Sequence, residues 1–415
     1  RDLHVRSRRQ RQMCIRDSAY TLERMNGELF WAGSMPAILP GDAEIPLAYY
    51  GESNVGRLKT LYRKGLSNRY GSSMQTIAGV HYNFSYSDDF WEKLRIKQKS
   101  ELSLEQFKNE SYFKMIRNLK RYSWLLMYLF GASPVVHSSF LEGKKHNLEK
   151  LSDNTYFTPE GVSLRMGGLG YTSSAQEDIV ICFDQVETYI KTIEQARLES
   201  YPDYEKMGLI KEGVYQQLNT NLIQIDNEFY STIRPKNIAK SRESALKALY
   251  HRGVEYVEVR LLDNDPFAPL GVTAEQIDFM HLFLSWCLTT DSPFLTDKEN
   301  MAIDDNFLRV VNHGRKKGLK IIDKFEEKNL LEVAKSLMSD IEVSLSKVME
   351  NENYKRAFST QLDKIENPSL IPANRVLSEL SLFENDYLRF HLSKAKKFIP
   401  NFKADKNFSR QLDEI

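Results

Sequence analysis

Three segments of the chain place carboxylates, an imidazole and a guanidinium at alternating positions, where they could do chemistry together. The side chains are His81 and Asn83 in residues 79–87, Gln224, Asp226 and Glu228 in residues 217–236, and Glu258 and Arg260 in residues 253–267. Successive side chains of a β-strand point to opposite faces, so each set would share one face of a strand. For one strand alone, a solvated surface with ion pairs is the better explanation. Because three strands carry polar residues of similar kinds, the face could instead be a functional site. The solvated surface and the functional site both remain open interpretations.

Carboxylates with an imidazole suit a hard divalent cation such as Mg²⁺, which prefers oxygen ligands and retains waters. An arginine beside such a cation is a typical partner of a phosphoryl group, because it stabilises negative charge on the transferring oxygens. The chain has no G-x-x-x-x-G-K-[ST] loop, which argues against a P-loop nucleotide site. Gly167–Ser174 is only weakly similar to a dinucleotide fingerprint, because it lacks the third glycine and a βαβ frame.

Helical and loop segments must hold these strands in place. Residues 50–71 open on a turn and continue as a basic helix, and residues 103–130 carry apolar side chains at helical spacing up to Gly131. Residues 162–173 form a glycine-rich loop that contains Arg165 and Tyr171. Beyond residue 272 the pattern is helical almost to the end. We therefore predict an α+β fold, with a mixed region over residues 19–275 and a helical region over residues 276–415.

The composition narrows the class of partner. The 415-residue chain has a formal net charge of +1, which gives no electrostatic argument for nucleic acid or an anionic membrane. Its three cysteines are too scattered for a disulfide framework or a zinc site, so we expect a reducing, cytoplasmic setting. The apolar run Tyr122–Val136 is broken by glycine, serine and proline, and we interpret it as the buried end of a helix. A monomer is expected, although the sequence does not decide the oligomeric state.

The first residues differ from the rest of the chain. Arg1–Ser18 is rich in arginine and has neither a helical nor a strand period. It lacks the apolar core of a signal peptide and the serine-rich amphipathic pattern of a transit peptide. A basic arm for nucleic acid is one alternative. We expect instead a non-native stretch joined to a truncated protein, and we leave it out of the fold prediction.

Six segments carry a resemblance to a known family. They are YGESNVGRLKTLYRKGLSNRYG, MQTIAGVHYNFS, YLFGASPVVHSSFL, SLRMGGLGYTS, IQIDNEFYSTIRPK and GVEYVEVRLLDNDPFAPLGV. In this order they resemble the proteobacterial type of glutamate–cysteine ligase. The resemblance implies a fold similar to glutamine synthetase, in which an antiparallel sheet forms one wall of a funnel-shaped active site. It also implies ATP as co-substrate, Mg²⁺ (or Mn²⁺) as cofactor, and phosphorylation of the γ-carboxylate of L-glutamate before attack by L-cysteine, in the first step of glutathione synthesis.

The same resemblance implies roles for individual residues. His81 and Glu258 are similar to metal ligands of the family, Arg260 to its phosphoryl contact and Arg165 to the arginine that binds a substrate carboxylate. Residues similar to the surroundings of the cysteine substrate are Tyr62, Tyr171, Tyr230, Gln75 and Ile77. Weaker candidates are Lys59, Arg63 and Arg234 for nucleotide phosphate and Glu228 for metal; a solvated basic face explains the first three about as well.

One departure from the family pattern affects the expected activity. The family has an amino-terminal segment with an E-x-E pair that completes its metal site, and in this sequence Arg1–Ser18 stands in that place. We therefore expect the chain as written to be inactive or nearly so, because fewer carboxylates hold Mg²⁺ less tightly. Two other functions remain open. One is a γ-glutamyl ligase with a different amine acceptor, and the other is a non-catalytic relative that binds magnesium nucleotide.

Overall fold

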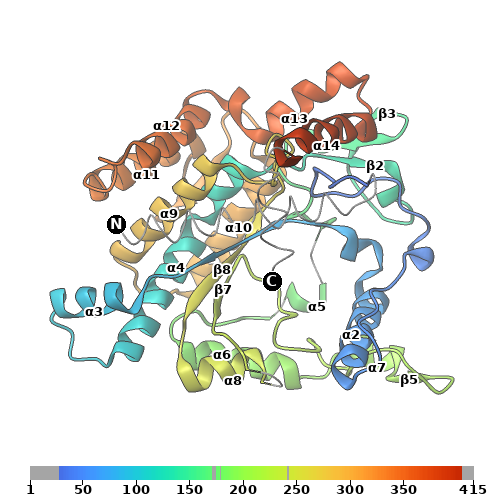
Figure 1. Cartoon of the computed structure of the whole chain (residues 1–415), viewed down its shortest axis with the longest axis horizontal. Coiled ribbons are helices and arrows are strands. Elements are labelled where there is room, and N and C mark those ends of the chain that lie inside the picture. The colour runs from blue at the N-terminus through green and yellow to red at the C-terminus, as the bar shows by residue number, and fades with distance from the viewer. Residues whose placement is uncertain (1–27, 171–173, 178, 241–242, 404–415) are drawn as a thin grey trace.

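The computed structural model describes residues 28–170, 174–177, 179–240 and 243–403 (Figure 1). Its helices are α2 (Asn54–Tyr70), α3 (Asp88–Lys97), α4 (Leu104–Phe130), α5 (Ser174–Glu177), α6 (Val186–Leu198), α7 (Pro202–Met207), α8 (Ala245–Arg252), α9 (Ala274–Thr289), α10 (Asp297–His313), α11 (Leu330–Ser344), α12 (Glu352–Glu366), α13 (Pro372–Leu380) and α14 (Tyr387–Lys403). Its strands are β1 (Val80–Phe84), β2 (Val135–His137), β3 (Glu149–Ser152), β4 (Thr155–Phe157), β5 (Ile210–Lys211), β6 (Val214–Tyr215), β7 (Ile233–Lys236), β8 (Tyr256–Leu262), β9 (Lys320–Asp323) and β10 (Glu326–Asn329). The Arg1–Ser18 stretch lies outside the described residues.

An antiparallel sheet of β1, β8 and β7 brings two of the three predicted polar faces together, with β8 in the middle. Glu258 on β8 lies opposite Asn83 on β1 and opposite Arg234 on β7. Residues directly opposite each other in an antiparallel pair point to the same side of the sheet. One face of this sheet therefore collects charged and amide side chains from three strands.

The other face of the sheet is part of the hydrophobic core. Val257, Val259 and Leu261 of β8 are fully buried, while Glu258 and Arg260 between them are partly exposed. Helix α4 packs against β7 and β8, and α9 packs against α4 in turn. Figure 1 shows α4, β7 and β8 at the centre of the molecule, with α11 to α14 above them and α2 at the right. This arrangement confirms the predicted α+β class with a core face and a polar face.

Two long helices end close to the positions predicted from their sequence. Helix α4 begins after Ser103, which forms a capping box with Gln106, and it ends at Gly131. Helix α2 begins after Ser53, whose hydroxyl accepts from the backbone of Gly56, and it ends at Gly71. The carboxyl-terminal half of α4 is buried, as we predicted for the apolar run. Within the described residues, no helix is both long and apolar enough to cross a membrane.

The strand predicted through Gln224, Asp226 and Glu228 is wrong. The chain there is irregular, and the ladder begins only at Ile233. Local side-chain bonds replace the ladder: the backbone N–H of Gln224 donates to Glu228 Oε2 at 2.6 Å, and Leu218 N donates to Gln224 Oε1 at 3.0 Å. Such bonds compete with regular strand pairing. The alternating pattern is present in the sequence, but side chains that accept from nearby backbone N–H groups hold this segment as a loop.

The helical region shares its core with the mixed region. The largest core cluster contains residues of β8 and α4 together with residues of α9, α11 and α12. The hairpin of β9 and β10 interrupts the helices and was not predicted. Cys182 and Cys287 are free thiols. Because the two regions share one core cluster, the division at residue 275 does not separate two cores. As a functional boundary, residue 275 stays a prediction.

Candidate active site

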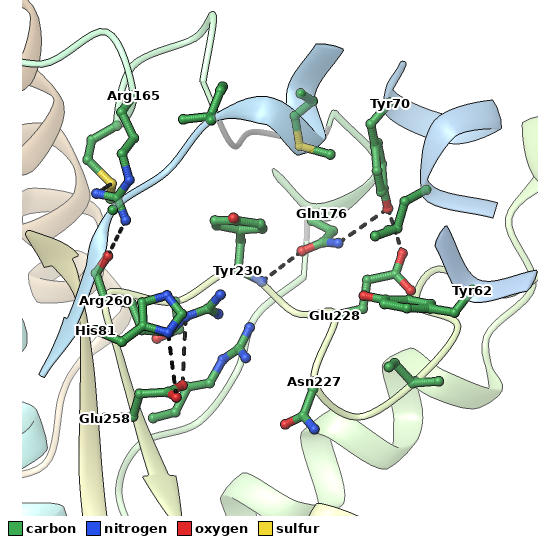
Figure 2. Close-up of a pocket in the computed structure, with 18 of the residues that line it drawn as sticks. Tyr62, Tyr70, His81, Arg165, Gln176, Asn227, Glu228, Tyr230, Glu258 and Arg260 are labelled. Atoms are coloured by element: carbon green, nitrogen blue, oxygen red, sulfur yellow. Dashed lines mark hydrogen bonds and ion pairs between the residues drawn. The ribbon is translucent and has the colours of Figure 1, made fainter. Parts of the chain in front are cut away.

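A cavity of about 360 Å³ opens above the polar face of the sheet. Its wall is built by α2, the residues before and within β1, the glycine-rich loop, residues 225–236 and β8. Figure 2 shows side chains from these separate segments pointing into one space. The predicted candidates that line it are Tyr62, Arg63, Ile77, His81, Arg165, Glu228, Tyr230, Arg234, Glu258 and Arg260.

Glu258 stands at the centre of the sheet side of the cavity. Its Oε1 lies 3.8 Å from His81 Nδ1, and its Oε2 lies 3.7 Å from Arg260 Nε and 3.8 Å from Lys236 Nζ. These separations exceed hydrogen-bond lengths, so the carboxylate is not locked to any one partner. Arg260 and Glu258 therefore do not form the tight surface ion pair that was the plainer interpretation of their spacing.

The cavity carries an excess of positive charge. Five cationic side chains line it, against the two carboxylates of Glu228 and Glu258. Burial lowers the pKa of Arg234 to about 10, with the neighbouring Arg260 adding to the effect. Burial also lowers the pKa of the Lys236 ammonium. An anion with more than one negative charge would relieve this repulsion between neighbouring cations.

Arg260 has a donor without a partner. Its Nη1 is buried and makes no hydrogen bond, while its guanidinium lies 5.6 Å from the centre of the Tyr230 ring. Its Nε lies 3.4 Å from His81 Nε2, a long hydrogen bond in which the imidazole accepts. A buried N–H without a partner is costly, so this group indicates a ligand oxygen at this place.

His81 is held in its neutral form. Burial lowers its pKa first, Arg260 lowers it further, and Glu258 acts in the opposite direction. A neutral imidazole has one donor and one acceptor nitrogen. Because Nε2 accepts from Arg260, the proton lies on Nδ1, toward Glu258. A cation on either nitrogen of this ring would therefore end the contact with Arg260 or displace the Nδ1 proton.

The opposite wall is aromatic and contains a buried ion pair. Arg69 Nη1 lies 3.5 Å from Glu228 Oε1, and both side chains are almost fully buried. Tyr70 donates to the same oxygen at 2.9 Å, and Gln176 joins Tyr70 Oη to the backbone N–H of Tyr230 (Figure 2). Burial raises the pKa of Glu228. Both Glu228 oxygens already accept hydrogen bonds, and the weak metal role of Glu228 stays a prediction.

Two predicted residues, Gln75 and Lys59, lie outside this cavity. Gln75 lines a second hollow of about 260 Å³, where its amide donates to the carbonyl of Arg63 at 3.1 Å. Arg63 borders both hollows. Lys59 lies over the ring of Tyr50, 5.6 Å from its centre, and lines neither hollow. Tyr171 lies outside the described residues.

Sequence reasoning missed other residues of the cavity. Lys236 alternates with Arg234 on β7, and that spacing of two could have revealed it. Tyr70 and Gln176 also line the cavity, but they belong to a helix end and a short helix with no telling pattern. Within the described residues, no group of three or more His, Cys, Asp or Glu side chains is placed to hold a metal ion.

Comparisons with known proteins show the family to which the chain belongs. The model of the family described as glutamate-cysteine ligase matches residues 10–310. The chain is 45% identical over 362 residues to a glutamate–cysteine ligase of Hahella chejuensis, covering 86% of this chain and 69% of that protein. It is 46% identical over 384 residues to one of Saccharophagus degradans, covering 91% and 72%.

The solved structures give the same result. A glutamate–cysteine ligase of Francisella tularensis in complex with AMP superposes with a TM-score of 0.88 at 35% identity, covering 97% of this chain and 80% of that chain. A bifunctional glutathione synthetase of Pasteurella multocida superposes with a TM-score of 0.71 at 22% identity over 44% of its own chain, and supports the fold alone.

Proposed function

The chain belongs to the glutamate–cysteine ligase family, and we propose that the cavity over β1, β8 and β7 is where ATP and L-glutamate meet. The family joins L-glutamate to L-cysteine in the first step of glutathione synthesis. A carboxylate is a poor electrophile until one of its oxygens becomes a leaving group. We infer that the γ-carboxylate attacks the terminal phosphorus of ATP, and that the cysteine amine then displaces phosphate from the γ-glutamyl phosphate.

One observation supports this assignment above the others. Arg260 holds a buried, unpartnered Nη1 inside a cavity whose cations outnumber its carboxylates. Phosphoryl transfer is catalysed mainly by positioning and by fixed positive charge around the transferring oxygens. A polyphosphate would satisfy both the missing hydrogen bond and the unbalanced charge. The AMP in the Francisella tularensis relative makes a nucleotide at this site reasonable.

The residues divide into three groups by position. Arg260 contacts the transferring phosphoryl group, and Arg234 and Lys236 on β7 neutralise the adjacent phosphates. Arg165, in the wall beside Gly79, receives a carboxylate of glutamate. The aromatic wall of Tyr62 and Tyr230 encloses the amine acceptor. Tyr171, Gln75 and Ile77 stay predictions for the same acceptor, and so does Arg63 for phosphate.

Two side chains fit a magnesium ion at this place. Glu258 offers carboxylate oxygens with no close partner, and His81 is neutral. Mg²⁺ usually takes one or two protein ligands and fills its shell with substrate phosphates and water, so a full protein cage is not required. When bound, the ion would screen the charge of the phosphate oxygens. The same ion would compete with Arg260 for the His81 imidazole. The Arg260 guanidinium would then be able to bind the phosphoryl group instead.

Replacing Glu258 with glutamine should raise the Mg²⁺ concentration needed for half-maximal rate by about 10- to 100-fold, because a carboxylate oxygen is lost from the ion. The measurement is the rate of ADP formation against Mg²⁺ at saturating ATP and glutamate. The matched control is Glu255→Gln, on the same segment, whose carboxylate pairs with Lys108 away from the cavity. An equal Mg²⁺ requirement in all three proteins would remove Glu258 from the metal site.

The expectation that the chain as written is inactive or nearly so stays a prediction. Phosphate release at the rate of the Saccharophagus degradans relative would contradict it. We further propose that the chain works as a monomer in the cytoplasm.

The acceptor is tested by substitution of the amine. Formation of ADP should depend on both L-glutamate and L-cysteine, and 2-aminobutyrate or other amines should support a lower kcat/KM. A higher kcat/KM for another amine would assign a different acceptor. Nucleotide binding with no ADP formation under any of these conditions would indicate a non-catalytic relative.

A further inference from the structure

A buried carboxylate, Asp263, lies directly behind Arg165. It follows the last residue of β8 and has no exposed surface. Its Oδ2 accepts from the backbone N–H of Ala132 at 2.9 Å and from Ser133 Oγ at 2.8 Å. Its Oδ1 accepts from Ser163 Oγ at 3.1 Å and from Arg165 Nη1 at 3.4 Å. One carboxylate thus joins the end of α4, the glycine-rich loop and the strand that carries Glu258 and Arg260.

Asp263 is the counter-ion of the Arg165 guanidinium. The arginine side chain is 5% exposed, and among the described residues Asp263 is the carboxylate within ion-pair distance of it. A buried guanidinium without a counter-ion is strongly unfavourable. Removing the charge of Asp263 would therefore favour a different position of Arg165, one nearer to water.

Two more contacts fix the orientation of the guanidinium. Arg165 Nη2 donates to the carbonyl of Arg260 at 2.6 Å, and Nη1 also contacts Met166 Sδ at 3.2 Å. The group lies flat against Gly79, where an added Cβ would sit 2.3 Å from Cζ and 2.4 Å from Nε. Only a glycine leaves room for the guanidinium at this place in the wall.

A donor count shows which edge is left for a ligand. A guanidinium has five N–H groups. The two on Nη1 are directed to Asp263 and Met166, and one on Nη2 is directed to Arg260. What remains is one N–H on Nη2 and the buried, unpartnered N–H on Nε. The terminal edge formed by Nη1 and Nη2 is therefore already used inside the protein, and the side edge formed by Nε and Nη2 is the part of Arg165 left for substrate.

We propose that Asp263 is a positioning residue for glutamate recognition, which acts by holding Arg165 against Gly79 with its Nε edge available. The inference rests on the proposed role of Arg165 as the contact of a glutamate carboxylate. It predicts that Asp263 affects glutamate binding and leaves nucleotide binding unchanged, because Arg260, Arg234 and Lys236 do not contact it.

The test is a titration of L-glutamate into the AMP-bound chain by calorimetry, with Asp263→Asn compared with the unchanged chain. Glutamate should bind about 10-fold more weakly, since a misplaced positioning group typically costs 10- to 100-fold, while the affinity for AMP stays the same. The matched control is Asp265→Asn, at a buried carboxylate two residues further on whose Oδ1 accepts from the backbone N–H of Phe267. It should leave glutamate binding unchanged.

A double-mutant cycle shows whether the effect passes through Arg165. In the chain that already carries Arg165→Lys, Asp263→Asn should weaken glutamate binding by less than about twofold. An undiminished effect in that background, or an equal loss of AMP binding, would overturn the proposal. If Arg165→Lys alone leaves glutamate binding unchanged, the proposed function of Arg165 fails first.

Gly79→Ala provides a second route that leaves Asp263 intact. The added methyl group would push the guanidinium from the wall, and glutamate affinity should fall while AMP affinity stays constant. Unchanged glutamate affinity in both Gly79→Ala and a folded Asp263→Asn variant would overturn the inference. If Asp263→Asn does not fold, the result of Gly79→Ala decides alone.

Discussion

Replacing Arg260 with lysine is expected to lower the rate of phosphoryl transfer by about 10²- to 10³-fold, the usual cost of one lost donor to developing charge. Lysine keeps the positive charge but not the planar set of donors, so the buried Nη1 position would have no N–H to offer. The measurement is a single-turnover assay of ADP formation, with the chain in excess over ATP and glutamate saturating. This design resolves the chemical step even if turnover is slow.

The control for Arg260 is Arg309→Lys, which alters an arginine paired with Asp305 and Glu327 far from the cavity lining. It should leave the single-turnover rate unchanged. Equal rates in the Arg260→Lys variant and the unchanged chain would mean that the polar face of β8 is only a solvated surface. A weaker affinity for AMP with an unchanged rate would assign Arg260 to nucleotide binding alone.

The second large effect concerns stability and lies in the opposite wall. Replacing Arg69 with methionine should lower the free energy of unfolding by about 3–5 kcal/mol, because Glu228 would remain as a buried charge without its partner. Arg69 also lies over the ring of Tyr204, 4.0 Å from its centre, and donates to the carbonyl of Asn219 at 2.7 Å. Denaturant unfolding followed by fluorescence measures the change.

Helix α2 supplies a matched control for this prediction. Arg57 on the same helix pairs with Glu52 on the surface, where both side chains are largely exposed. Arg57→Met should change stability far less, because exposed ion pairs contribute little. The double variant Arg69→Met with Glu228→Gln should recover part of the loss, since it removes both charges. Equal stability of the Arg69→Met and Arg57→Met variants would contradict the importance of the buried pair.

The strands β1 and β8 could be predicted because their side chains alternate without local competitors. The ends of α4 could also be predicted, because Ser103 caps its first turn and Gly131 follows its last residue. The bounds of β7 were missed because Gln224 and Glu228 before it accept from backbone N–H groups of nearby residues, and such a loop has the same alternating sequence pattern as a strand. The sequence pattern therefore predicted an element correctly where the local interactions and the tertiary contacts favour the same structure.

The candidate site shows the same limit. His81, Glu258 and Arg260 were predicted, and the structure brings them to one face of one sheet. The ion pair of Glu228 with Arg69 and that of Arg165 with Asp263 join residues far apart in the sequence. The spacing of residues along the chain does not show that Glu228 is paired with Arg69 in the interior while Glu258 stays available to a ligand. That distinction required the three-dimensional structure.

The central claim is that the γ-carboxylate of glutamate attacks ATP within this cavity. The most direct measurement uses L-glutamate labelled with ¹⁸O in its γ-carboxylate, incubated with the chain, ATP, Mg²⁺ and L-cysteine. Mass spectrometry of the released phosphate then follows the oxygen. We predict one labelled oxygen in each phosphate formed with the dipeptide, because that oxygen leaves with the phosphoryl group. Unlabelled phosphate released together with γ-glutamylcysteine would contradict the account.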